Sequence, residues 1–190
     1  GSMKKHILLL TTGGTIACAP GGEGLEPQRS SIMERELDQL RSYYDITVKD
    51  VICLDSSNIT PEEWQLIARA IFENRLDYDG IVVSHGTDTM AYTAAALSYL
   101  IQGSPKPVIL TGAQKPIGFD STDSKINLTD AFRCAASDLP GVSIVFNSHV
   151  ILGTRARKTR TKSFQAFSSV NYPELALIQD ERLLQYITTG

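Results

Sequence analysis

Four short segments of this 190-residue sequence concentrate hydroxyl, carboxylate and amide side chains beside glycine, and each follows a run of apolar residues. They are Thr12-Gly13-Gly14-Thr15, Asp55-Ser56-Ser57-Asn58, His85-Gly86-Thr87-Asp88-Thr89 and Thr111-Gly112-Ala113-Gln114. Taken alone, each segment is typical of a turn or a helix cap. Four such segments in equivalent positions favour a ligand site over four unrelated turns.

The residue types in these segments indicate nucleophilic catalysis by a threonine. The segments are rich in threonine and lack a Ser-His-Asp order. A free hydroxyl is a poor nucleophile at neutral pH, so a nearby base must activate it, and a lysine with a lowered pKa can serve. Lys158 is the candidate base because it lies within the cationic run of residues 155–162. Spacing alone does not separate it from Lys162, and the run could equally be a solvated loop or an anion-contacting patch.

Other kinds of site receive less support. A glycine-rich turn before a helix can hold phosphate, but neither a GxGxxG nor a GxxxxGK[ST] motif is present, so a nucleotide site is the weaker alternative. The cysteines form no CxxC pair and the histidines are scattered, which argues against a metal centre or a disulfide framework. These residues are Cys18, Cys53, Cys134, His6, His85 and His149. We therefore expect neither a metal nor a cofactor.

The elements that must position these segments alternate between strand and helix. Continuously apolar runs bounded by turn residues predict strands, and helical periodicity predicts the helices between them. Strands are expected over residues 6–10, 46–54, 80–84, 108–110, 142–146 and 150–152, and helices over 31–40, from 61, over 91–101 and over 127–136. This order predicts an α/β fold, a doubly wound and mostly parallel sheet with helices on both faces. In such sheets ligands bind beyond the carboxyl ends of the strands, where the four segments lie.

Two helix starts carry capping signals. Thr60-Pro61-Glu62-Glu63 combines an N-cap hydroxyl, a proline at the first helical position and a glutamate at the third. Ser31 and Glu34 have the same capping-box spacing. The helix that follows Thr60 is expected to turn its apolar stripe inward, and this stripe comprises Trp64, Ile67, Ala68 and Ile71.

Composition bounds the class of protein. Hydrophobic residues make up 42% of the chain and charged residues 21%, which are ordinary globular values. The net charge of -3 gives no general reason to expect a nucleic-acid or membrane partner. No apolar stretch reaches the roughly 20 residues of a membrane-spanning helix. Residues 1–3 resemble an expression-tag remnant, and the lack of a signal-peptide pattern leads us to expect a cytoplasmic protein.

Two of the segments extend into motifs that identify a family. Thr12-Gly13-Gly14-Thr15-Ile16-Ala17 and His85-Gly86-Thr87-Asp88-Thr89-Met90 resemble the two signatures of bacterial-type, cytoplasmic (type I) L-asparaginases. The segments at Asp55, Thr111 and residues 153–171 are similar in order and spacing, so the resemblance covers nearly all of residues 6–175. It implies a flavodoxin-like, cofactor-free catalytic domain that hydrolyses L-asparagine to aspartate and ammonia.

The resemblance also implies residue roles. Thr15 would be the nucleophile, and Thr87, Asp88 and Lys158 would form a second catalytic group in which the lysine moves a proton through a threonine hydroxyl. Asp88 would also bind the substrate ammonium. Ser56 and Ser57 match positions that hold the substrate carboxylate, and Ala113 matches a position whose backbone lines the pocket. The family pattern gives His85 no proton-transfer role, so we expect it to order its loop.

Two departures from the family pattern concern the mobile loop and the length. Family members commonly carry a tyrosine after the nucleophile, whereas Leu25 lies near that place and no tyrosine occurs between Thr15 and Ser42. Typical members also add a smaller carboxy-terminal domain that helps complete a neighbouring subunit's site, which implies a homo-oligomer. We expect residues 4–178 to form the catalytic domain and residues 179–190 to begin a linker or form a tail, so that the enzyme is a truncated or naturally short form. The alternatives are a tRNA-dependent amidotransferase subunit and a non-catalytic amino-acid-binding or oligomerisation domain.

Overall fold

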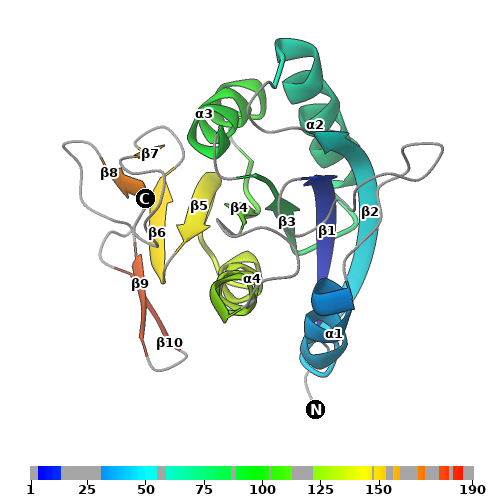
Figure 1. Ribbon diagram of the computed structural model, residues 1–190, viewed down its shortest axis with the longest axis vertical. Coiled ribbons are helices and arrows are strands. Elements are labelled where there is room, and N and C mark those ends of the chain that lie inside the picture. The colour runs from blue at the N-terminus through cyan, green and yellow to red at the C-terminus, as the bar shows by residue number, and fades with distance from the viewer. Residues whose placement is uncertain are drawn as a thin grey trace.

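Five parallel strands in the order β2-β1-β3-β4-β5 form the centre of the fold (Figure 1). Their bounds are β1 (Lys5–Gly13), β2 (Tyr44–Leu54), β3 (Gly80–Ser84), β4 (Val108–Thr111) and β5 (Val142–Phe146). This is the flavodoxin-type strand order. The computed structural model describes residues 4–13, 31–54, 59–86, 89–102, 104–112, 122–146, 148–152, 156–158, 167–169, 176–179 and 182–185.

The sheet continues beyond β5 with antiparallel strands. The hairpin strand β6 (His149–Leu152) pairs with β5, and β9 (Ala176–Gln179) and β10 (Arg182–Gln185) extend the same sheet to eight strands. A separate two-stranded ladder joins β7 (Ala156–Lys158) to β8 (Phe167–Ser169). The predicted boundary after residue 178 falls within β9, and the division of the chain into domain and tail stays a prediction.

Helices cover both faces of the sheet, as a doubly wound fold requires (Figure 1). They are α1 (Ser31–Leu40), α2 (Pro61–Asn74), α3 (Met90–Leu100) and α4 (Thr122–Ala135). The side chains of β1 alternate between the two cores. Ile7 and Leu9 pack with residues of α1 and α4, whereas Leu8 and Leu10 pack with residues of α2 and α3. All four are fully buried, which explains why the strand is continuously apolar. The predicted fold class is confirmed.

Helix α2 begins as its sequence predicts. The Thr60 hydroxyl accepts a hydrogen bond from the backbone N–H of Glu63 at 3.4 Å, and the Glu63 carboxylate accepts one from the backbone N–H of Thr60 at 3.0 Å. Ile67 and Ile71 lie in the core as expected, and Trp64 is partly buried. The cap side chain of Ser31 lies outside the described residues.

The remaining elements differ from prediction mainly at their ends. Helix α4 begins at Thr122 rather than at Asn127, because its first turn is polar and offers no apolar periodicity from which to read a helix. Strands β7 to β10 were not expected; β7 and β8 have the sequences Ala-Arg-Lys and Phe-Ser-Ser, which contain no apolar run. Within the described residues, no helix combines the length and apolarity needed to cross a membrane.

Candidate functional site

Most of the predicted site residues lie outside the described part of the chain. These are Thr15, Ser56, Ser57, Thr87, Asp88 and Ala113. Lys158 lies in β7, of which the backbone is described. The structure instead describes the carboxyl ends of β1, β3 and β4, which directly precede three of the predicted segments.

A row of polar residues crosses four neighbouring strands at this edge of the sheet. In the strand registers, Thr11 pairs with Asp50 on one side and with Ser84 on the other, and Ser84 pairs with Thr111. The Thr11 hydroxyl donates a 2.5 Å hydrogen bond to the Asp50 carboxylate, and the Thr111 hydroxyl donates a 2.7 Å bond to the carbonyl of Val145. These side-chain hydrogen bonds join β1 to β2 and β4 to β5 at the row where the four strands are paired.

The predicted catalytic segments begin at this row. Thr15 follows Thr11, Thr87 follows Ser84 and Ala113 follows Thr111, each by at most four residues. Neighbouring strands lie about 4.8 Å apart, so the strand ends that precede the three segments lie side by side. The expectation that they start at one edge is confirmed, whereas the roles of their residues stay predictions.

A close backbone approach holds the ends of β3 and β4 together. The backbone N–H of His85 donates to the carbonyl of Thr111 at 2.9 Å. A Cβ atom on Gly112 would lie 2.0 Å from the His85 carbonyl oxygen, so only glycine fits. The amide of Asn127 donates a buried 2.8 Å bond to the Gly112 carbonyl and ties α4 to the same point.

The end of β1 is tied to β3 in the same way. The buried Thr12 hydroxyl donates a 2.7 Å hydrogen bond to the carbonyl of Ser84. The first residue of the TGGTIA motif therefore holds the backbone that enters the HGTDTM motif. Such a bond between the two motifs cannot be inferred from either motif alone.

The His85 side chain is fixed at both ring nitrogens. Its Nδ1 atom lies 2.7 Å from the carbonyl oxygen of Gly86, and its Nε2 atom lies 3.0 Å from the hydroxyl of Thr93 on α3. The ring is only 1% exposed, and this burial lowers its pKa. Both nitrogens thus contact the protein interior, in keeping with a residue that orders its loop. Thr93 and its partner Trp64 were missed by sequence reasoning, because no motif links side chains on separate elements.

Strand β7 brings the backbone of Lys158 next to the helix that follows the second motif. β7 lies against α3, and α3 begins at Met90, directly after the segment that contains Thr87 and Asp88 (Figure 1). Within β7 the backbone of Lys158 pairs with Phe167. The alternative base, Lys162, lies outside the described residues.

A buried carboxyl group on α4 also escaped sequence reasoning. Asp130 is 6% exposed, accepts a 3.3 Å hydrogen bond from the Ser148 hydroxyl and lies 3.7 Å from the Arg133 guanidinium. Burial raises its pKa to about 6, and the two partners only partly offset that rise. The neighbouring Cys134 thiol is also buried, and desolvation raises its pKa to about 12. This thiol is therefore not a reactive nucleophile.

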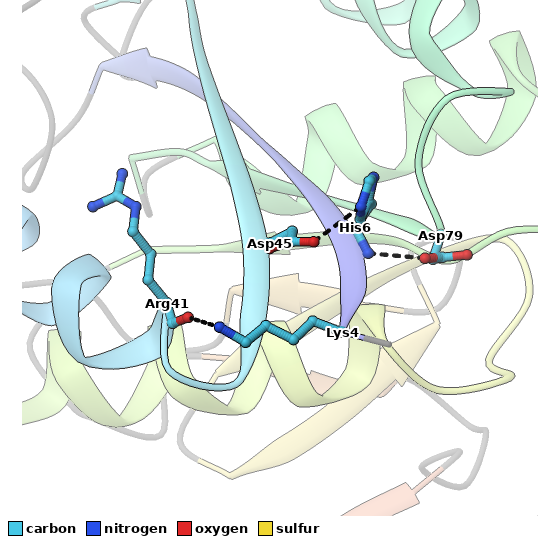
Figure 2. Close-up of polar contacts among 5 residues, drawn as sticks. All are labelled: Lys4, His6, Arg41, Asp45 and Asp79. Carbon is cyan, nitrogen blue, oxygen red and sulfur yellow. Dashed lines mark hydrogen bonds and ion pairs between the residues drawn. The ribbon is translucent and has the colours of Figure 1, made fainter. Parts of the chain in front are cut away.

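The opposite edge of the sheet carries its own polar contacts (Figure 2). His6 pairs with Asp45 at 3.0 Å through its ring and donates to Asp79 at 2.8 Å through its backbone N–H, while Lys4 donates to the carbonyl of Arg41 at 2.8 Å. A surface hollow of about 270 Å³ is lined there by His6, Arg41, Tyr44, Asp45, Ile46 and Thr47. These contacts join chain segments at the amino ends of the strands, whereas parallel α/β sheets bind ligands at the carboxyl ends.

The fold defines an α/β domain in which the predicted site segments follow the carboxyl ends of neighbouring parallel strands. No group of three metal-binding side chains occurs among the residues that the structure describes. The chain belongs to the asparaginase family: the model for the asparaginase N-terminal domain matches residues 6–188. The family predicted from the two motifs is thus confirmed.

Known relatives include two kinds of protein. The chain is 41% identical over 180 residues to an L-asparaginase of Thermococcus kodakarensis, covering 94% of this chain and 55% of that protein. It is 37% identical over 191 residues to a glutamyl-tRNA(Gln) amidotransferase subunit of Methanosphaera stadtmanae, covering 95% of this chain and 43% of that protein. The chain thus spans about half the length of the curated relatives it matches.

Solved structures agree with this family. The structure of the thermostable L-asparaginase of T. kodakarensis has a TM-score of 0.87 at 39% identity, and the match covers 97% of this chain and 57% of that one. A probable cytoplasmic L-asparaginase of Campylobacter jejuni has a TM-score of 0.82 at 30% identity, covering 98% of this chain and 57% of that one.

Proposed function

We propose that this chain is the amino-terminal, catalytic part of an L-asparagine amidohydrolase, which converts asparagine and water to aspartate and ammonia. The observation that carries the proposal is the register of β1 and β3. In this register Thr11 pairs with Ser84 on the neighbouring strand, and each of these residues directly precedes one of the two family motifs. A nucleophile from one motif and a second catalytic group from the other can then act on one substrate.

In the proposed reaction, the hydroxyl oxygen of Thr15 attacks the carbonyl carbon of the substrate's side-chain amide. Lys158 accepts the hydroxyl proton through Thr87, and the proton is passed to the departing nitrogen. The carbon–nitrogen bond breaks, ammonia leaves and an ester to Thr15 remains. Water then attacks the ester, which releases aspartate and restores the hydroxyl.

The remaining predicted residues would bind the substrate. Asp88 faces its α-ammonium group with a charge-assisted hydrogen bond, and Ser56 and Ser57 hold its α-carboxylate. The backbone of Ala113 lines the pocket. Backbone N–H groups near Thr15 would stabilise the oxyanion, because preorganised donors act where charge develops in the transition state.

The position of β7 supports the choice of Lys158 as the base. Its backbone belongs to a strand that lies against α3, the helix that follows Asp88. The proton-transfer role itself rests on the family resemblance.

Ammonia release from L-asparagine by the purified chain tests the proposal, with Thr15→Ala as the critical variant. We expect Thr15→Ala to abolish turnover while asparagine binding, measured by calorimetry, survives, because the hydroxyl reacts and other groups bind the ground state. Thr47→Ala is the matched control, since Thr47 is exposed on β2 near the opposite edge of the sheet. Near-normal turnover by Thr15→Ala would remove the nucleophile assignment.

A second candidate function is that of an amidotransferase subunit, which the M. stadtmanae relative favours. Comparing asparagine with glutamine as the amide donor helps to separate the two candidates. Rapid hydrolysis of free asparagine by the chain alone supports the amidohydrolase. Binding of an amino acid without any ammonia release would instead support a non-catalytic binding domain.

We further propose a cytoplasmic homo-oligomer. The outer side of α3 supports association, because Tyr92 is 68% exposed, Tyr99 is 75% exposed and Leu100 is 44% exposed, with no charged residue in the helix. A helix that is apolar on all sides is normally covered. The outer side of α3 carries a stripe with the sequence Tyr, Ala, Ala, Tyr at residues 92, 95, 96 and 99. Because this stripe reads the same in both directions, it suits an antiparallel contact between two copies about a two-fold axis. The cytoplasmic location is supported by the description of the C. jejuni relative.

A further inference from the structure

A directed chain of hydrogen bonds links helices α2 and α3 to the start of the second motif. The indole Nε1–H of Trp64 donates to the hydroxyl oxygen of Thr93 at 2.9 Å. The Thr93 hydroxyl lies 3.0 Å from Nε2 of His85, and Nδ1 of His85 lies 2.7 Å from the carbonyl oxygen of Gly86. Thr93, His85 and Gly86 are all buried.

The chemistry of these groups fixes the direction of every bond. A carbonyl oxygen only accepts, so Nδ1 of His85 must carry the proton. Burial lowers the pKa of the ring, which is therefore neutral at physiological pH, and its Nε2 atom is an acceptor. The Thr93 hydroxyl must then donate to Nε2, and its oxygen accepts from Trp64. All the donors point the same way along the chain, an arrangement in which each bond strengthens the next.

The bonded carbonyl belongs to the residue that precedes Thr87. The peptide group that precedes His85 is also held, because the carbonyl of Ser84 accepts from Thr12 and the N–H of His85 donates to Thr111. The ring bond to Gly86 is thus the last described restraint before the segment that contains Thr87 and Asp88.

We propose that Trp64 and Thr93 are positioning residues of the active site: they hold the His85 ring in one tautomer, so that its Nδ1–H fixes the Gly86 carbonyl and the backbone entering Thr87 and Asp88. This inference rests on the proposed function, because it assigns catalytic work to Thr87 and Asp88. Neither Trp64 nor Thr93 touches the substrate, and both act through His85.

The central variant is Thr93→Val, which keeps the shape of the side chain and removes the bridging hydroxyl. We expect kcat for asparagine to fall about 10- to 100-fold, since small misplacements of catalytic groups have effects of this size. Thr93→Ser keeps the hydroxyl and should restore most of the activity. Trp64→Phe removes only the first donor and should have a smaller effect in the same direction.

Ser98→Ala is the matched control. Ser98 lies on the same helix and donates a partly buried 2.8 Å bond to the carbonyl of Ala94, so this variant also loses one hydroxyl hydrogen bond, but outside the chain that leads to His85. We expect its kcat and KM to match those of the unchanged protein. Equal losses in Thr93→Val and Ser98→Ala would overturn the proposal, because they would reflect a general weakening of α3.

Two further measurements do not depend on activity. Nitrogen-15 NMR of the ring should show the proton of His85 on Nδ1, and a proton on Nε2 at neutral pH would overturn the proposal. Amide hydrogen exchange over residues 86–89 should be at least about 10-fold faster in Thr93→Val than in Ser98→Ala, because the loop loses a restraint. Unchanged exchange would also overturn it.

These measurements separate failure of the inference from failure of the proposed function. If the unchanged chain releases no ammonia, the amidohydrolase assignment fails, while the tautomer and the exchange rates still decide whether the positioning chain exists. If Thr93→Val does not fold, Trp64→Phe and the tautomer of the unchanged protein decide the question.

Discussion

Replacing Asp130 by asparagine should make the protein more stable at neutral pH and leave it nearly unchanged in acid. The Asp130 carboxyl has a pKa of about 6 in the folded protein and an ordinary value of 3.8. The folded state therefore binds the proton more tightly than the unfolded state does. By linkage, the destabilisation by the carboxyl is small below pH 3.8, grows as the pH rises from 3.8 to 6 and levels off above pH 6.

The size of the effect follows from the two pKa values. The gap of roughly two units corresponds to about 3 kcal/mol at 1.36 kcal/mol per unit. At pH 4.5 the charged carboxyl already destabilises the folded state by about 1 kcal/mol. The gain in the free energy of unfolding from Asp130→Asn should therefore grow by about 2 kcal/mol between pH 4.5 and pH 8. The contacts with Ser148 and Arg133 need no separate correction, because they already act on the pKa.

Urea unfolding at pH 4.5, 6 and 8 measures this difference, and the fluorescence of Trp64, the single tryptophan, reports it. Subtracting the free energy of unfolding of the unchanged protein cancels the titration of every other group. Asp138→Asn is the control, because it removes the same kind of carboxyl group at an exposed position just beyond the same helix. A constant difference for Asp130→Asn would refute the reasoning, and so would a greater stability of the unchanged protein at pH 8.

Three further predictions concern the site and the outer surface. Gly112→Ala and Gly80→Ala each place a Cβ 2.0 Å from a backbone carbonyl oxygen, so each should lower the free energy of unfolding by about 1 to 3 kcal/mol. Only Gly112→Ala should also reduce kcat of the folded protein in the ammonia assay. Lys158→Met should lower kcat far more than it raises KM; if Lys162→Met does so instead in the same ammonia assay, the base is misplaced. Tyr99→Arg should shift the species seen by analytical ultracentrifugation towards monomer, and an unchanged distribution would exclude the outer side of α3 as the contact.

The fold could be predicted from sequence because its elements carry local signals. The strand at residues 80–84 is apolar on both faces, which suits a position between two helical layers, and Thr60 with Glu63 marks a helix start to the residue. The start of α4 at Thr122 could not be found, because its first turn carries no apolar periodicity. Such a turn is helical through its connection to the rest of the helix and not through its own composition.

The site could be predicted only in part, for a different reason. The edge of the sheet and the motifs follow from order along the chain. The hydrogen bond between Trp64 and Thr93 joins two helices, and the burial of Asp130 depends on how α4 packs. The apolar stripe places Trp64 on the inner side of its helix, but nothing in the sequence pairs it with Thr93 or separates Asp130 from an aspartate at the surface. Their roles depend on tertiary packing.

The level of the polar row across the sheet nevertheless has a sequence origin. Each central strand is apolar until one position and then changes to a hydroxyl residue: Leu10 to Thr11, Val83 to Ser84 and Leu110 to Thr111. In the structure these hydroxyl residues are paired across the three strands. A register of β1 shifted by one residue would separate the Thr11 hydroxyl from Asp50 and the Thr12 hydroxyl from the Ser84 carbonyl, which would leave two buried hydroxyls without these partners at a cost in free energy. The positions at which the apolar runs end thus select the register, and the register in turn sets the two family motifs next to each other.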